Sequence, residues 1–77
     1  PQLLINVEVK DKNAVMEAPE IQEAVAEAEH FLEGNGRVLV RASGTEPLIR
    51  VLAEAPEQDL CQKADDNVIE ALAPYRV

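Results

Sequence analysis

The chain lacks the residues that staple small extracellular domains together or anchor a protein in a membrane. Its 77 residues include one cysteine, no tryptophan, one tyrosine and one phenylalanine. A single cysteine excludes an intramolecular disulfide and is typical of a reducing compartment such as the cytoplasm. No apolar run approaches the ~20 residues of a membrane span, and no signal-peptide pattern opens the chain. The length and the 47% hydrophobic content predict one small domain over residues 1–77. Because the chain opens directly on a predicted strand, it is compatible with a piece of a longer protein.

Basic residues are also scarce, and their distribution is uneven. Seven lysines and arginines stand against fifteen acidic residues, and the net charge of −8 argues against nucleic acid or an anionic membrane as a partner. Residues 37–50 are the exception, because Arg37, Arg41 and Arg50 lie there with a single acid, Glu46, and give the segment a net charge of +2. Positive charge is therefore concentrated in one short segment of an acidic chain.

Hydrophobic periodicity predicts an α+β fold in the order strand, helix, strand, strand, helix. Residues 3–9 alternate between apolar and polar side chains, as in a half-buried strand. Residues 11–19 predict an irregular linker that ends at Pro19. From Pro19 to Leu32 apolar side chains recur at spacings of three and four, which predicts an amphipathic helix. The Gly-Asn-Gly sequence at 34–36 should terminate this helix.

The second half of the chain predicts a hairpin followed by a second helix. Residues 37–42 and 48–54 are the next two strands, and five residues between them are too few for a parallel crossover. A helix then opens at Pro56 and Glu57 and stops at Pro74. Its apolar stripe consists of Leu60, Cys61, Ala64, Val68, Ala71 and Leu72. We expect a small antiparallel sheet with both helices packed on one face.

The register of the hairpin follows from keeping one of its faces apolar. A one-residue slip would mix apolar and charged side chains on that face, which sheet packing disfavours. The preferred register creates the pairs Arg37–Glu54, Leu39–Leu52 and Arg41–Arg50. Its apolar face consists of Val38, Val40, Ala42, Ile49, Val51 and Ala53. Leu39 and Leu52 share the arginine face, which either a neighbouring domain or local packing would explain.

This register creates an unfavourable contact that a bound anion would relieve. Arg41 and Arg50 become cross-strand neighbours, and like charges directly opposite one another destabilise a sheet. Between them, Ser43 and Thr45 offer hydroxyl donors, and Gly44 lets backbone N–H groups approach an anion. Guanidinium groups also match phosphate oxygens in bidentate pairs. The segment is therefore a candidate phosphate cradle.

The same residues suit an ordinary turn, and the pattern alone leaves both interpretations open. Ser-Gly-Thr and Glu-Pro are common in hairpin loops of this length, and the Arg37–Glu54 pair is an ordinary surface ion pair.

Other chemically distinctive residues favour structural roles. Cys61 lies on the second helix's apolar stripe, as a small buried hydrophobe would, whereas His30 falls off the first helix's stripe and should be exposed. Met16 and Phe31 are predicted to pack in or at the edge of the core. The acidic pair at 65 and 66 lies within a helix without a third metal ligand nearby.

The segment RVLVRASGTEPLIRV resembles the phosphate-binding loop in the C-terminal domain of the α-D-phosphohexomutases. Its SGTEP form is most similar to the phosphoglucosamine mutases, whereas phosphomannomutase-like members often carry asparagine where Gly44 stands. The similarity extends to the QLLINV strand, to EIQEAVAEAE before a Gly-Asn-Gly turn, and to the final acidic helix. The resemblance implies the TATA-box-binding-protein-like fold of the family's last, fourth domain.

The resemblance also implies a role for each loop residue. The implied phosphate-binding residues are Arg41, Ser43, Gly44, Thr45 and Arg50, with Arg50 in a supporting role. Glu46 and Pro47 would shape the loop. The implied parent enzyme is a cytoplasmic isomerase of amino sugar metabolism, a magnesium-dependent phosphoprotein. It would interconvert glucosamine 6-phosphate and glucosamine 1-phosphate through a bisphosphate intermediate.

The chain departs from the family in lacking the phosphorylated serine, the aspartate cluster for magnesium and the sugar-recognition loop. We therefore expect no catalytic residue, metal ligand or cofactor in residues 1–77, and no activity of the domain alone. The expected partners are a phosphosugar substrate and other domains of the same enzyme. The alternatives are a domain of a phosphomannomutase or phosphoglucomutase, a non-enzymatic module that docks acidic partners through its arginine face, and a purely structural hairpin.

Overall fold

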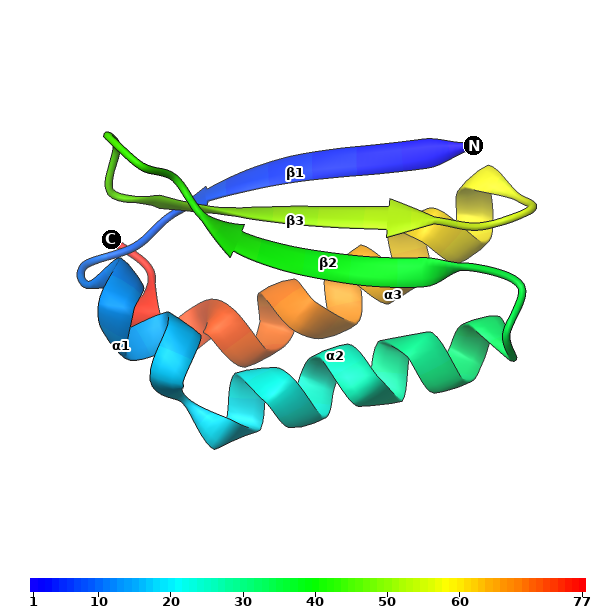
Figure 1. Ribbon diagram of the computed structural model, residues 1–77, viewed down its shortest axis with the longest axis horizontal. Helices are drawn as coiled ribbons and strands as arrows, with labels where there is room; N and C mark the ends of the chain where they lie inside the picture. The colour runs from blue at the N-terminus through cyan, green and yellow to red at the C-terminus, as the bar shows by residue number, and fades with distance from the viewer.

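A computed structural model describes residues 1–77 and confirms the predicted α+β fold class. The predicted strands and helices occur in the predicted order, and a short helix near the start and a 3-10 turn at the end are added (Figure 1). The elements are β1 (Gln2–Glu8), α1 (Lys12–Glu17), α2 (Pro19–Leu32), β2 (Arg37–Ala42), β3 (Leu48–Glu54), α3 (Gln58–Leu72) and η1 (Ala73–Tyr75).

The three strands form one antiparallel sheet in the order β1–β3–β2. The hairpin register predicted from the apolar face is confirmed, with the pairs Arg37–Glu54, Leu39–Leu52 and Arg41–Arg50. On the other side of β3, strand β1 places Asn6 opposite Arg50 and Leu4 opposite Leu52. The sheet's central strand is thus β3, which carries one arginine of the pair.

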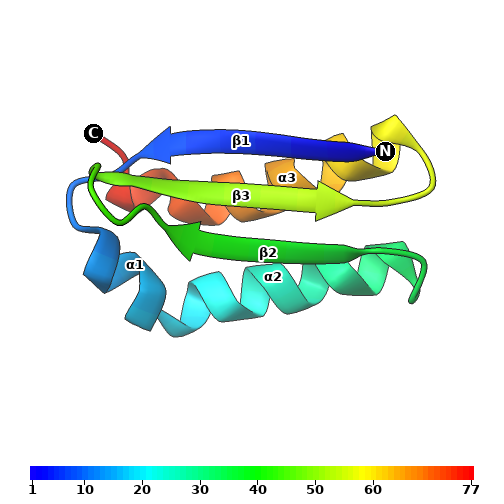
Figure 2. The ribbon, with the colours of Figure 1, turned by 45° about the horizontal axis from the view of Figure 1, so that its top comes forward.

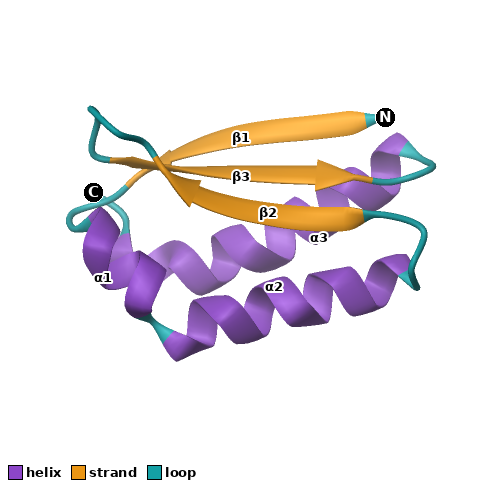
Figure 3. Ribbon diagram, in the orientation of Figure 1, coloured by secondary structure: helices purple, strands orange, loops and turns teal.

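Both long helices cover the same face of the sheet and leave the other face open. Helix α3 packs against β1 and β3, and α2 packs against β2 (Figures 2 and 3). The inward side chains of β3, Ile49, Val51 and Ala53, have no exposed surface. Burying a side chain the size of Val or Ile stabilises the fold by about 1.5–3 kcal/mol. None of the helices combines the length and the apolar character needed to cross a membrane.

The predicted irregular linker at residues 11–19 is wrong, because most of it forms α1. Asp11 caps this helix by accepting hydrogen bonds from the backbone N–H groups of Asn13 at 3.0 Å and Ala14 at 3.2 Å. Aspartate is among the preferred N-cap residues, so this signal was present in the sequence. Val15 is fully buried and fixes α1 against the core. Met16, predicted to pack in the core or at its edge, is instead 41% exposed.

The predicted termination of α2 before its Gly-Asn-Gly sequence is confirmed, but the left-handed conformation begins one residue earlier, at Glu33. The left-handed residues are Glu33, with φ of 50°, and Gly34, with φ of 80°. Gly36 is required for a different reason, since a Cβ added there would lie 2.0 Å from the backbone oxygen of Glu54. The turn therefore brings β2 tightly beside the end of β3.

The predicted stripe of α3 is confirmed, and so are the predictions for three individual side chains. Leu60 and Ala71 are half-buried, and the other four members of the stripe are buried. Cys61 is buried, Phe31 is half-buried and His30 is exposed, as expected.

Candidate phosphate-binding site

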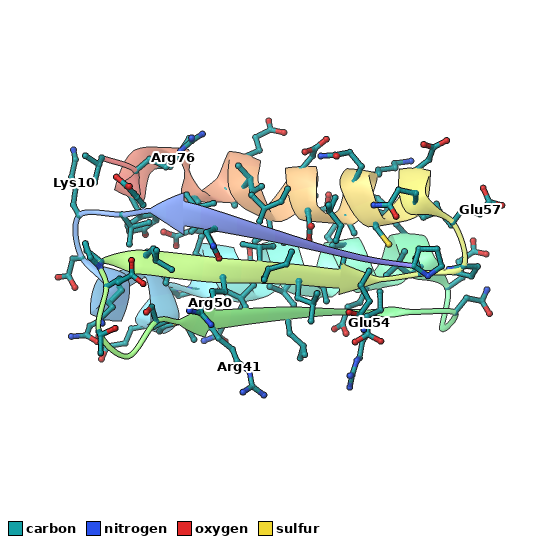
Figure 4. All side chains as sticks on the ribbon, turned by 90° about the horizontal axis from the view of Figure 1, so that it is seen from above. Lys10, Arg41, Arg50, Glu54, Glu57 and Arg76 are labelled. Atoms are coloured by element: carbon teal, nitrogen blue, oxygen red, sulfur yellow. The ribbon has the colours of Figure 1, made fainter.

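The open face of the sheet carries a row of leucines beside a row of polar and basic residues. Figure 4 looks onto this face, with Arg41 and Arg50 on neighbouring strands toward the β2–β3 loop and Glu54 toward the other end. Leu4 is 53% exposed. A hollow of about 280 Å³ joins the two rows and is lined by Leu4, Leu39, Arg41, Arg50 and Leu52.

The arginine pair has no carboxylate partner within the chain. Arg41 and Arg50 are both exposed and directly paired across the strands, and neither makes an ion pair. Arg37 shows the contrast, because its guanidinium Nη2 lies 3.0 Å from Oε1 of Glu54 and its Nε 3.2 Å from the same oxygen. The charges are neutralised at one end of the hairpin and remain unneutralised at the loop end, where an anion would be stabilised.

The loop between the arginines is held as a tight, internally bonded turn. The Ser43 backbone N–H donates to the Leu48 oxygen at 3.0 Å, which closes the hairpin. Ser43 is only 6% exposed, and its Oγ accepts a hydrogen bond from the Glu46 N–H at 3.3 Å. The hydroxyl of Ser43 is thus already engaged in shaping the loop, although its own proton can still be donated.

Gly44 and Thr45 form the exposed tip of the turn. Neither backbone N–H group has a hydrogen-bond acceptor within the chain, so both are available to a ligand. A Cβ built on Gly44 would meet no atom within 4 Å, and Gly44 does not have a positive φ. The fold itself therefore does not require glycine there. An approaching anion would explain why a side chain is absent at this tip.

Lys12 donates hydrogen bonds to the loop, a contact that the sequence did not predict. Its Nζ lies 2.5 Å from the backbone oxygen of Ser43 and 3.3 Å from that of Glu46. The two contacts join residues 31 and 34 positions apart in the chain. No local pattern announces a contact of that kind, so only the fold reveals it.

Asp65 was also missed, although it lies on the helical layer and outside the arginine face. It is fully buried, and neither of its carboxylate oxygens has a hydrogen-bond partner. Burial and then the neighbouring charge of Asp66 raise the pKa of Asp65 to about 7. Its place four residues after Cys61 and three before Val68 put it on the apolar stripe, which was the available signal.

The polar hollow between the two long helices does not suit a phosphate. One of about 550 Å³ between α2 and α3 is lined by acids that include Glu20, Glu23, Glu27 and Glu70, which would repel an anion. The chain contains no group of three histidine, cysteine, aspartate or glutamate side chains that could hold a metal ion.

The fold and its loop define a class of protein: a small α+β domain that presents an arginine-flanked hairpin loop. Residues 4–71 match the family model for the phosphoglucomutase/phosphomannomutase C-terminal domain, and the chain belongs to this family.

Curated relatives narrow the similarity to phosphoglucosamine mutases. The enzyme from Exiguobacterium sibiricum is 53% identical over 73 residues, which cover 95% of this chain and 15% of the relative. The one from Mycolicibacterium paratuberculosis is 50% identical over 76 residues, or 99% of this chain and 17% of the relative. The chain thus spans about a sixth of the length of these relatives.

Solved structures agree with this relationship. The N-acetylphosphoglucosamine mutase of Aspergillus fumigatus, in complex with glucose 1,6-bisphosphate, superposes with a TM-score of 0.78 at 27% identity, over 100% of this chain and 16% of that one. A complex of the Aspergillus enzyme with GlcNAc-6P and magnesium gives a TM-score of 0.74 at the same identity and coverage.

Proposed function

We propose that this chain is the substrate-phosphate-binding domain of a phosphoglucosamine mutase. The proposed phosphate ligands are Arg41, Ser43, Gly44, Thr45 and Arg50, and Glu46 and Pro47 shape the loop. The observation that carries the proposal is a pair of exposed arginines without a carboxylate partner, next to a turn tip with two unbonded backbone N–H groups. Guanidinium forks and convergent N–H groups are the donors that phosphate oxygens prefer.

In this role the domain positions its substrate and neutralises charge. Arg41 and Arg50 share the phosphate's charge, and the bound anion in turn relieves their mutual repulsion. The N–H groups of Gly44 and Thr45 fix the orientation of the phosphate, and Ser43 contributes its hydroxyl proton. Holding the phosphate that does not react places the rest of the sugar for phosphoryl transfer elsewhere in the enzyme.

The parent enzyme would interconvert glucosamine 6-phosphate and glucosamine 1-phosphate through a bisphosphate intermediate. The names of the relatives at about 50% identity and the bisphosphate held by the Aspergillus structure support this reaction. Magnesium, present in an Aspergillus complex, does not fit the residues of this chain, whose carboxylates form no three-ligand group. The proposal places the metal site in the rest of the enzyme. It places the enzyme in the cytoplasm, and the single buried, free cysteine supports that placement.

A phosphate titration of the ¹⁵N-labelled chain tests the proposal. Inorganic phosphate and glucosamine 6-phosphate should shift the amide signals of residues 41–50 selectively, with millimolar affinity because contacts from other domains are missing. Replacing Arg41 with glutamine should weaken binding about tenfold. The matched control Arg37→Gln, on the same strand and face but paired with Glu54, should change affinity less than twofold. Absence of any selective shift at 50 mM phosphate would overturn the proposal.

A further inference from the structure

We propose that Lys12 is a positioning residue that sets the phosphate loop in its binding conformation. The inference rests on the proposed function of the loop, and it assigns a role to a residue outside the RASGTEPLIR segment. Lys12 comes from the start of α1, at the same end of the sheet as the β2–β3 loop (Figure 1). Its ammonium group donates to two backbone oxygens of the loop, those of Ser43 and Glu46.

The contact with the Ser43 oxygen determines where the Gly44 N–H points. The chain contains no cis peptide bond, so the C=O of Ser43 and the N–H of Gly44 point in opposite directions from one peptide plane. With the Ser43 oxygen held 2.5 Å from Lys12 Nζ, the Gly44 N–H is directed away from α1. That N–H has no acceptor within the chain and lies at the exposed tip. Lys12 thereby presents the donor without touching the ligand.

The second contact restrains the loop at a peptide that has no N–H group to offer a ligand. The Glu46 oxygen, 3.3 Å from Lys12 Nζ, belongs to the peptide that precedes Pro47, which has no N–H. The two carbonyls stand on either side of the tip residues Gly44 and Thr45. One ammonium group therefore ties both ends of the turn together and restrains the segment between them.

The fold holds Lys12 in place and leaves its charge unpaired. Asp11, its sequence neighbour, is occupied as the N-cap of α1 and forms no ion pair with it. Val15, one turn further along α1, is fully buried and anchors the helix. Lys12 itself is half-buried against the loop. The ammonium thus adds a positive charge beside a loop that is already flanked by Arg41 and Arg50.

Two substitutions separate positioning from charge. Lys12→Met keeps the apolar stem and removes both hydrogen bonds and the charge. Lys10→Met removes the same charge nearby, from an exposed side chain that makes no hydrogen bond and extends from the end of β1, away from β2 (Figure 4). Without phosphate, Lys12→Met should shift the amide signals of Gly44 and Thr45 and speed the hydrogen exchange of the Glu46 N–H, which is bonded to Ser43 Oγ in the intact loop. Lys10→Met should leave these signals unchanged.

Phosphate titrations of the same variants give the quantitative test. Lys12→Met should bind inorganic phosphate about 5–10-fold more weakly than the unsubstituted chain, and Lys10→Met less than twofold more weakly. The ratio of the dissociation constants of Lys12→Met and the unsubstituted chain should persist at about 0.5 M salt, where screening removes long-range charge effects. Lys12→Arg, which keeps donors and charge, should recover most of the affinity. If Lys12→Met loses the dispersed spectrum of a folded chain, Lys12→Gln provides the same comparison with an N–H donor of shorter reach.

The outcomes distinguish this inference from the proposed function. If the unsubstituted chain fails to bind phosphate, the proposed function fails, and the inference fails with it. If that chain binds but Lys12→Met binds equally well, the loop remains a phosphate site and the role of Lys12 is overturned. A ratio that disappears at high salt would also overturn positioning, because it would reduce Lys12 to a distant charge.

Discussion

Asp65 lies on the buried side of α3, and neither of its carboxylate oxygens is hydrogen-bonded. Burial, reinforced by Asp66, raises its pKa from 3.8 to about 7. Between these two pH values the folded chain holds a proton that the unfolded chain has released, so the free energy of unfolding falls as pH rises. The loss of stability caused by the buried charge is complete above about pH 7. A pKa raised this far lowers the free energy of unfolding by a few kcal/mol, on the order of 1.4 kcal/mol per pKa unit.

Removing this carboxylate should therefore stabilise the chain most at neutral and alkaline pH. Asp65→Val should raise the free energy of unfolding at pH 8 by roughly 2 kcal/mol or more, and by less at pH 4. Urea unfolding measured across that range provides the test. Glu70→Gln is the control, because Glu70 is an exposed carboxylate on the same helix that does not contribute to the raised pKa of Asp65. A gain that did not vary with pH would show that Asp65 does not titrate in this window.

Gly36 and Gly44 should respond differently to substitution by alanine. Gly36→Ala forces a methyl group against the Glu54 oxygen, 2.0 Å from the built Cβ, and should cost about 3 kcal/mol of stability. Gly44→Ala meets open space and should leave thermal unfolding within about 0.5 kcal/mol of the unsubstituted chain. Its added methyl should nevertheless weaken phosphate binding severalfold, because it stands at the tip that a phosphate would approach in the proposed site. A Gly44→Ala chain with unchanged affinity would remove the backbone of the tip from the proposed site.

If the proposed function holds, the arginine pair of the β2–β3 hairpin should couple the stability of the chain to phosphate binding. Arg41→Gln removes a like-charge contact with Arg50 and should stabilise the chain by about 0.5 kcal/mol without phosphate. Phosphate should raise the melting temperature of the unsubstituted chain, since a ligand that binds only the folded state stabilises it, and should raise that of Arg41→Gln much less. Thermal scans in chloride and phosphate of equal ionic strength measure both effects. Equal shifts in the two proteins would indicate a general salt effect.

The elements that the sequence predicted correctly are those whose pattern is local. The hairpin register follows from one constraint, that Val40 and Val51 stay inside while Arg41 and Arg50 stay outside. Helix α1 was missed because six residues give too short a period, although the cap at Asp11 was visible. The central place of β3 and the contact of Lys12 with the loop could not be predicted, because both depend on how distant segments meet.

The whole molecule separates its charges between two layers. Acidic side chains surround the hollow between α2 and α3, whereas the open face of the sheet carries the unpaired arginines. With a net charge of −8, the chain repels anions at long range, so in the proposed function only the short-range contacts of the loop would attract a phosphate. Screening at physiological salt, with a Debye length of about 8 Å, limits the repulsion to neighbouring groups. A single local site on an acidic domain is consistent with binding that needs the rest of an enzyme to become tight.

The 77 residues should bind a phosphosugar without converting it. The single serine, Ser43, is buried and engaged with the Glu46 N–H, and no three carboxylates converge on a possible metal site. Incubating the chain with glucosamine 6-phosphate, magnesium and a catalytic amount of the bisphosphate should produce no glucosamine 1-phosphate by ³¹P NMR. A full-length phosphoglucosamine mutase such as the Exiguobacterium sibiricum relative is the positive control. Product formation that Arg41→Gln abolishes would place catalytic groups within this chain and contradict the proposed division of labour, in which the loop holds one phosphate while the chemistry occurs in another domain.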